Sequence, residues 1–123
     1  MEKLYTDKAP AAIGPYSQAI KLGNIIYTSG QIPINPESGN IDCDDIVGQT
    51  EQVCKNLAAV LTEGGSSPEK VVKTTCFLSD MANFASFNTV YAKYFTSCPA
   101  RSCVAVKELP RGVLVEIEAI AEI

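Results

Sequence analysis

The side chains with the clearest chemical potential lie near the C-terminus, and their spacing is that of a β-strand. In the run VLVEIEAIA, Glu116 and Glu118 alternate with apolar residues. Side chains on one face of a strand recur at every second residue, so the two carboxylates would share a face, roughly 7 Å apart. The opposite face, from Val113 to Ala121, is uniformly apolar and is expected to pack against helices.

Arg101 is the cation that we expect near these carboxylates. It is one of only two arginines in 123 residues, and a guanidinium binds a planar carboxylate through paired hydrogen bonds. The strand-like runs 101–108 and 113–120 flank the turn sequence LPRG, which predicts an antiparallel hairpin. In that hairpin Arg101 would share the face of both carboxylates.

Two interpretations of this face stay open. It is either a solvated surface with cross-strand charge pairs, each contributing about 1 kcal/mol at most, or a cleft at an interface. In the second case Arg101 would hold an anion and one of the two glutamates would act as a base. The pattern by itself favours the first interpretation slightly.

A second group of candidates lies in the N-terminal third, where turns hold polar side chains. The segment IGPYSQA places Tyr16 at a turn, and YTSGQ ends a predicted strand with Ser29 followed by Gly30. Turn chemistry alone explains both segments, because glycine provides backbone freedom and hydroxyl and amide groups bond to nearby backbone. Each segment taken singly fits that structural role better than a functional one.

Cys103 and Lys73 are the possible nucleophiles. In the predicted hairpin Cys103 lies opposite Glu118, and the nearby Arg101 would favour a thiolate. The cysteine has no histidine partner and no clear base, so a small packed residue or backbone contacts fit it better. Lys73 would form a Schiff base only if it were desolvated, and a surface lysine on a strand is the more common case.

The absence of histidine narrows the possible chemistry. It excludes a Ser-His-Asp triad, a Cys-His pair, a histidine-ligated metal and a histidine pH switch. Acid–base steps would have to use carboxylates, Lys, Tyr, Cys or water. The net charge of −4, with the basic residues scattered singly, argues against a nucleic-acid partner.

Cysteine usage and hydropathy predict a cytoplasmic protein. The five cysteines form an odd set without a CxxC pair, which disfavours a disulfide framework or a zinc site and favours free thiols. The N-terminus lacks the basic and apolar regions of a signal peptide. No apolar run approaches the ~18 residues of a membrane span.

The periodicity predicts a single domain over residues 1–123, of the α+β class. Helices are expected from a cap at Asp44 or Asp45 to Gly64, and from about Ala82 to Phe95. The strand candidates are Lys3–Tyr5, Gln18–Leu22, Ile25–Ser29, Val71–Leu78, Arg101–Glu108 and Val113–Ile120. We expect a mostly antiparallel sheet with both helices on one face and a partner subunit over the other.

Most of the chain resembles the RidA family (reactive intermediate deaminase A, also called YjgF), and in particular its archetypal deaminase branch. The matching stretches are APAAIGPYSQAI at 9–20, TSGQIP at 28–33, VVKTTCFLSDM at 71–81, FNTVYAKYF at 87–95 and PARSCVAVKELPRGVLVEIEAIA at 99–121. The resemblance implies a fold like that of the trimeric chorismate mutases. In that homotrimer three sheets enclose a central core, the helices lie outside, and the active-site clefts lie between subunits.

The resemblance also implies a reaction, the cofactor-free and metal-free hydrolysis of enamines and imines of the 2-aminoacrylate/2-iminopropanoate class. The products are 2-keto acids and ammonia. Arg101 would pair with the substrate carboxylate, and Glu116 would position or activate the attacking water. The remaining substrate-binding residues would be Tyr16, Ser29, Gly30, Asn88 and Cys103, the last through its backbone.

Two sequence features qualify this expectation. Glu118 matches a second glutamate of the family motif and is expected to be structural. Only Thr96–Cys98 separates Phe95 from Pro99, a link shorter than in many relatives, so the substrate range stays open. An alternative is a non-catalytic trimer that binds keto or amino acids in the same clefts, and an RNA-directed activity, attributed to some relatives, is the weakest possibility.

Overall fold

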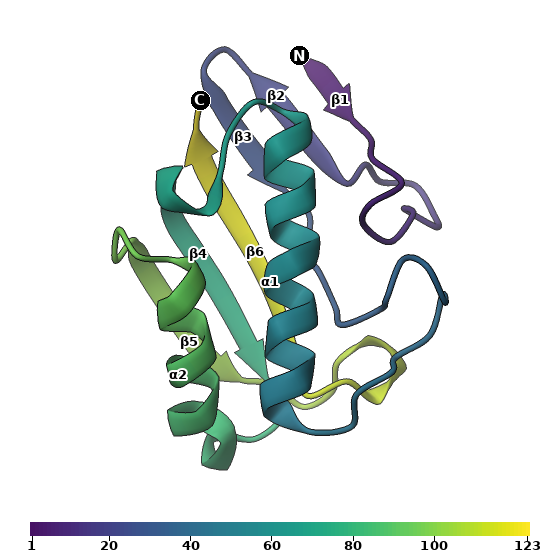
Figure 1. Cartoon of the computed structure of the whole chain (residues 1–123), viewed down its shortest axis with the longest axis vertical. Coiled ribbons are helices and arrows are strands. Elements are labelled where there is room, and N and C mark those ends of the chain that lie inside the picture. The colour runs from purple at the N-terminus through teal and green to yellow at the C-terminus, as the bar shows by residue number, and fades with distance from the viewer.

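The computed structural model describes all 123 residues and is built around one six-stranded sheet (Figure 1). The strands are β1 (Glu2–Leu4), β2 (Ala19–Leu22), β3 (Ile25–Thr28), β4 (Val71–Leu78), β5 (Ala100–Ala105) and β6 (Val115–Glu122). They lie in the order β1-β2-β3-β6-β4-β5, and only the β4–β5 pair is parallel. The predicted strands and the mostly antiparallel sheet are therefore confirmed, with ends shifted by a few residues.

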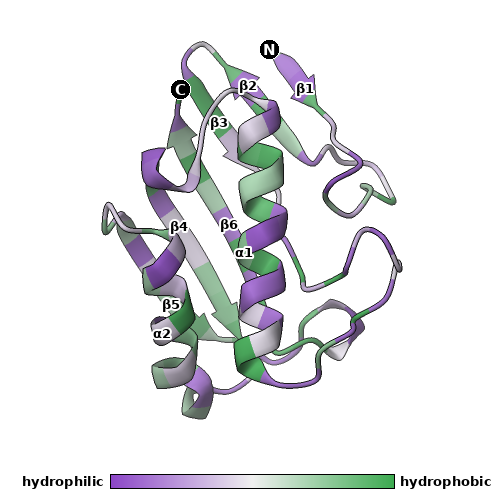
Figure 2. Cartoon of the chain, in the orientation of Figure 1, coloured by the Kyte–Doolittle hydropathy of each residue, from purple (hydrophilic) through white to green (hydrophobic).

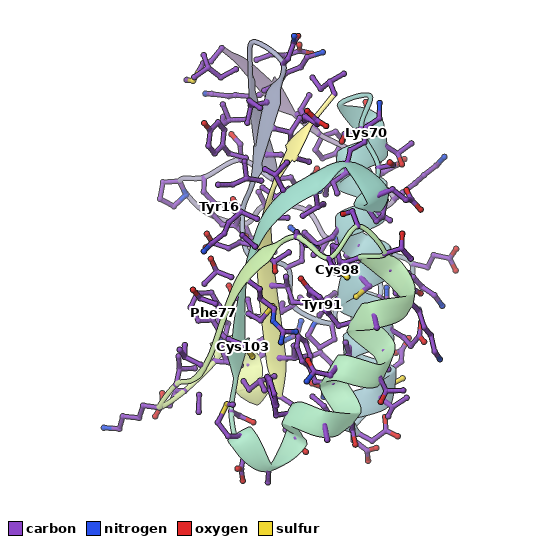
Figure 3. All side chains as sticks on the ribbon, turned by 90° about the vertical axis from the view of Figure 1, so that its left-hand side faces the viewer. Tyr16, Lys70, Phe77, Tyr91, Cys98 and Cys103 are labelled. Atoms are coloured by element: carbon purple, nitrogen blue, oxygen red, sulfur yellow. The ribbon has the colours of Figure 1, made fainter.

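Two long helices, α1 (Ile46–Glu63) and α2 (Phe84–Tyr94), cover the same face of the sheet, as expected (Figures 1 and 3). Short 3₁₀ turns lie at η1 (Pro68–Lys70), η2 (Met81–Asn83) and η3 (Pro110–Gly112). None of the helices combines the length and the apolar character that crossing a membrane requires.

Helix α1 begins and ends where the sequence signals predict. The Asp45 carboxylate accepts a hydrogen bond from the Gly48 backbone N–H (2.8 Å), which caps an otherwise unpaired donor of the first turn. At the other end Gly65 adopts a φ of +88°, a conformation that other residues rarely reach. The buried side chains between these ends include Val53, Leu57 and Leu61, which form the apolar stripe that packs on the sheet.

The predicted hairpin between the last two strands is wrong. Strand β4 lies between β5 and β6, and it pairs with β5 in parallel and with β6 antiparallel. Helix α2 joins β4 to β5, and a helical crossover of this kind sets two adjacent strands parallel. The connection from β5 to β6 therefore passes the end of β4, where Val106 donates to the Leu78 carbonyl and Ser79 donates to the Leu114 carbonyl.

The core lies between the sheet and the two helices. The apolar face predicted for the last strand is confirmed, because Val115, Ile117, Ala119 and Ala121 are each at most 2% exposed. In Figure 2 hydrophobic (green) and hydrophilic (purple) bands alternate along both helices, as expected for helices with one buried side. The other sheet face has no helix over it, and its apolar side chains include the exposed residues Leu22, Tyr27 and Val104.

Candidate active site

Glu116 lies in a cavity on the helix-free side of the sheet. The cavity has a volume of about 330 Å³. It is lined by Tyr16, Ser29, Gly30, Ile32, Pro110 and Glu116. The structure therefore brings together four of the residues that the sequence singled out, from three separate segments of the chain.

The backbone around residue 30 sets the position of the Glu116 side chain. Gln31 forms a two-way backbone bridge to Ile117, with N–O distances of 2.8 and 3.2 Å, and this bridge brings Gly30 beside Glu116. A Cβ atom on Gly30 would collide with Oε1 of Glu116 and would lie 2.9 Å from its Cδ. Only glycine at position 30 leaves room for this carboxylate.

Ser29 and Tyr16 complete the same wall. The Ser29 hydroxyl donates to the Ser17 carbonyl (2.6 Å), and the Ser29 N–H donates to the Gln18 carbonyl (2.9 Å). These two bonds tie the end of β3 to the loop that carries Tyr16, whose side chain is 54% exposed beside the cavity. The Ser29 hydroxyl is thus occupied as a donor and can still accept a hydrogen bond.

Burial raises the pKa of Glu116, and the neighbouring Glu118 carboxylate raises it further. Within the single copy no cation is among the causes of this shift, and no lysine or arginine forms an ion pair with Glu116. A carboxyl with a raised pKa is a better proton acceptor than an ordinary glutamate once it is ionised. Glu118 is exposed and lies outside the cavity lining.

Arg101 lies in a second and larger cavity, between β5 and the C-terminal half of α2. This cavity has a volume of about 490 Å³. It is lined by Asn88, Tyr91, Ala92, Phe95, Thr96, Cys98, Pro99 and Arg101. Thr96 and Cys98 of the short link between Phe95 and Pro99 form part of its wall.

The Arg101 guanidinium is held by α2 and not by a carboxylate. Its Nη1 donates to Oδ1 of Asn88 (2.8 Å). Its Cζ lies 4.9 Å from the ring centre of Tyr91, 5.4 Å from that of Phe84 and 6.0 Å from that of Phe87. Aromatic faces stabilise a cation without neutralising it, so the remaining guanidinium donors stay available for an anion.

The prediction that Arg101 shares a face with Glu116 is wrong. Thr74 of β4 pairs with Arg101 and with Ala119, whereas Phe77 of β4 pairs with Glu116. Paired residues point to the same face, and residues 74 and 77 point to opposite faces. Arg101 therefore points toward the helices and Glu116 points away from them. In Figure 3 the labelled residues Tyr16 and Phe77 lie on one side of the sheet and Tyr91 on the other.

Cys103 shares the helix-facing side with Arg101, because it pairs with Cys76 in the core. Burial raises the pKa of the Cys103 thiol, and Arg101 offsets this only in part. The thiol is therefore neutral at physiological pH. Lys73 lines neither cavity, and no group of three or more side chains is arranged as a metal site.

The aromatic cradle of Arg101 is a feature that sequence reasoning missed. Phe84, Phe87 and Tyr91 belong to the helix that the sequence predicts from about Ala82 to Phe95. Their spacing at three and four residues also places three rings in a row beside one guanidinium. Asn88, expected from the family resemblance to bind substrate, is the side chain that bonds to Arg101.

Comparison with known proteins identifies the family. The model of the family described as Endoribonuclease L-PSP matches residues 6–123. Over 120 residues the chain is 48% identical to the 2-iminobutanoate/2-iminopropanoate deaminase of Escherichia coli, covering 94% of this chain and 93% of that protein. The chain belongs to the RidA family.

Other RidA relatives carry different descriptions. A Lactococcus lactis protein to which a regulatory role is attributed, AldR, is 51% identical and covers 100% of this chain and 98% of its own length. The solved structure of a Rid-family protein of unknown function from Yersinia pestis is 51% identical, with a TM-score of 0.96 and coverage of 99% and 98%. Escherichia coli TdcF with bound serine is 40% identical, with a TM-score of 0.95 and coverage of 100% and 99%.

Proposed function

We propose that this protein hydrolyses reactive 2-enamine and 2-imine acids, of the 2-aminoacrylate/2-iminopropanoate class, to 2-keto acids and ammonia. The observation that carries the proposal is the pair of complementary cavities. One holds a cation whose donors are free for a carboxylate, and the other holds a half-buried carboxyl with a raised pKa. The 48% identity to a deaminase of this substrate class supports it.

The two cavities act on one substrate only if two copies of the chain meet. Arg101 and Glu116 lie on opposite faces of the sheet, so a single copy cannot place both beside one small molecule. We propose a head-to-tail homotrimer of the single 1–123 domain, in which the Arg101 cavity of one copy faces the Glu116 cavity of the next. The uncovered sheet face, with exposed Tyr27 and Val104, would be buried in that assembly.

In the proposed reaction Arg101 binds the substrate carboxylate and orients the imine carbon. Glu116 accepts a proton as water attacks that carbon, and the C=N π electrons move to nitrogen. Glu116 returns this proton to the nitrogen, which gives a carbinolamine. The proton of the new hydroxyl then passes to the nitrogen, directly or through Glu116, as the C–N bond breaks with its electrons on the departing ammonia and the C–O bond becomes the keto group. No oxidant, cofactor or metal enters this balance, because the imine is already a strong electrophile. Positioning and electrostatics therefore supply the catalysis.

The other predicted residues have supporting roles in this proposal. Asn88 holds the guanidinium, and Gly30 leaves space for the Glu116 carboxyl. Tyr16 and Ser29 shape the wall of the Glu116 cavity. Cys103 contributes backbone contacts and not a thiolate, since its pKa is raised.

A subunit-mixing experiment tests the proposal. Arg101→Gln and Glu116→Gln should each abolish release of ammonia and keto acid from 2-aminoacrylate generated in situ. Co-refolding the two variants in equal amounts should restore about one quarter of the wild-type activity, because random assembly pairs an intact Arg101 with an intact Glu116 at that frequency. Unchanged activity of either single variant would refute the chemistry. No recovery on mixing, with both variants folded and assembled, would refute the shared site.

The second candidate is a non-catalytic binder of small amino or keto acids. The bound serine in the TdcF structure and the regulatory description of AldR favour it. Carboxylate binding that depends on Arg101, without turnover of any imine, would select this function. We do not extend the proposal to RNA, because the net charge of −4 opposes binding of a polyanion and the chain has no histidine to act as an imidazole base.

A further inference from the structure

A third cavity lies beside the Glu116 cavity and contains the second arginine of the chain. Its volume is about 190 Å³. Residues from the N-terminal loop, from the segment after β3 and from the η3 turn line it, among them Ile13, Tyr16, Gln18, Gln31, Ile34 and Arg111. Pockets for drug-sized ligands measure roughly 300–1,000 Å³, so this cavity suits a molecule of three to five carbons.

Gln31 is the most informative residue of this cavity. It is only 5% exposed, and its backbone is fully used in the bridge to Ile117. Its side-chain amide makes no hydrogen bond within the chain. The one side-chain polar atom that is both occluded and unpaired is Oγ1 of Thr50, so the Gln31 amide must reach open space. The cavity that Gln31 lines is that space.

Gln18, another buried glutamine in the lining of the same cavity, has a side-chain amide that is fully hydrogen-bonded within the protein. It is 2% exposed, and its amide oxygen accepts from the Thr6 N–H (2.7 Å). Its amide nitrogen donates to the carbonyls of Thr6 (3.0 Å) and Pro10 (2.8 Å). A buried amide is ordinarily satisfied in this way. The Gln31 amide has no partner within the protein and lines the cavity, so a polar ligand there can bond to it in place of water.

Arg111 supplies the positive charge in the lining of this cavity. It has a positive φ of 57°, which is uncommon for a residue with a side chain. Its only hydrogen bond is a long one, from Nη1 to the Gly39 carbonyl (3.5 Å). No carboxylate pairs with it. The guanidinium is therefore free to bind a carboxylate through a bidentate pair of hydrogen bonds.

We propose that this cavity is a second binding site, for a small carboxylic acid that carries a further polar group, such as a 2-keto or 2-amino acid. The carboxylate would bind Arg111, and the keto or amino group would bond to the Gln31 amide. Gln31 pairs with Ile117, so its side chain points to the face opposite Glu116. The site uses neither Arg101 nor Glu116, so it does not depend on the proposed reaction.

Calorimetric titration with pyruvate tests the site. An Arg101→Gln background removes the other arginine cavity from the measurement. In that background pyruvate should still bind, and adding Arg111→Gln or Gln31→Leu should weaken binding about tenfold or more. Lys107→Gln is the matched control, because it removes one exposed cation that lines none of the three cavities. Propanamide, of similar size but uncharged, should not bind.

The outcomes separate this site from the proposed active site. Loss of all pyruvate binding in the Arg101→Gln variant would overturn the second site, whether or not the deaminase proposal holds. Equal binding by the Arg111→Gln and Lys107→Gln variants would overturn it as well. A crystal soaked in pyruvate should show its carboxylate on Arg111. Water alone at the Gln31 amide in the soaked crystal would show that the cavity is only hydrated, and would overturn the proposal. Thermal unfolding of each variant confirms that the fold is retained.

Discussion

Arg101 and Glu116 extend from one sheet in opposite directions, because Thr74 pairs with Arg101 and Phe77 pairs with Glu116 on the central strand between them. Rotation about side-chain bonds cannot bring the two charges together through a packed sheet. The guanidinium instead bonds to Asn88 of α2, and the carboxyl lies against Gly30. Each of the two side chains is thus held in place by its own neighbours, and the proposed site is completed only by a second copy of the chain.

The raised pKa of Glu116 predicts how stability depends on pH. Between the ordinary value of 4.5 and its raised value, the folded state holds a proton that the unfolded state has lost. Stability therefore falls as the pH rises through this window. Glu116→Gln is neutral throughout, so it should unfold at a higher temperature than the wild type near neutral pH and lose that advantage below the ordinary value. Thermal unfolding across a pH series checks this, and a constant difference at all pH values would contradict it.

The same pKa shift predicts the acid limb of the activity profile. The proposed base is active only when it is ionised, so kcat/KM should decline at a higher pH than an unperturbed glutamate with a pKa of 4.5 would give. Removing the negative neighbour by Glu118→Gln should shift the limb toward lower pH, because Glu118 contributes to the raised pKa. Steady-state rates measured with buffers of matched ionic strength test both statements. A limb that stays in place in the variant would rule out the Glu118 contribution.

Gly30→Ala should disable the Glu116 cavity while leaving the fold nearly intact. The new Cβ would meet the end of the Glu116 side chain, which is flexible and can move aside. We expect kcat/KM to fall by about 10²-fold, as misplacement of a reacting group by an ångström can cost that much. The free energy of unfolding should change by about 1 kcal/mol or less. In a Glu116→Gln background, Gly30→Ala should cause little further loss of the residual activity, and an additive loss would show that the two residues act separately.

Replacing Asn88 should show whether it positions Arg101. Asn88→Ala removes the 2.8 Å bond to the guanidinium and should raise KM about tenfold, while kcat changes less. Asn88→Asp should be more harmful, because a carboxylate there would form an ion pair with Arg101 and compete with the substrate. Steady-state kinetics of the two variants decide the question. Equal effects would indicate a packing role for Asn88.

Cys103 should tolerate substitution and react slowly. Its pKa is raised and it is partly buried, so Cys103→Ala should retain activity within about twofold of the wild type. In timed labelling with iodoacetamide followed by mass spectrometry, the exposed Cys43 and Cys98 should be modified before Cys103. Rapid labelling of Cys103, with loss of activity, would contradict this prediction and indicate that Cys103 acts as a nucleophile.

The sequence by itself determined the local elements. The apolar stripe of α1, its Asp45 cap and the glycine at its end are short-range signals, and the helix forms between them. The alternation from Val113 to Ala121 likewise fixed which side of β6 is buried, since a one-residue shift would expose the whole apolar set. Some site candidates could also be chosen from the sequence, because Tyr16 and Ser29 stood at turns and Glu116 alternated with apolar residues on its strand.

Only the tertiary structure decided which of those candidates lie together. The LPRG turn between two strands fits a hairpin, but it fits equally a connection past the end of β4, and local signals do not distinguish the two. The crossover through α2 sets β5 parallel to β4 and leaves the other side of β4 to β6. That pairing turned Arg101 toward the helices, where its guanidinium lies beside three aromatic rings of α2. Strand order depends on contacts between residues far apart in the chain, and the periodicity of a single strand carries no information about its neighbour.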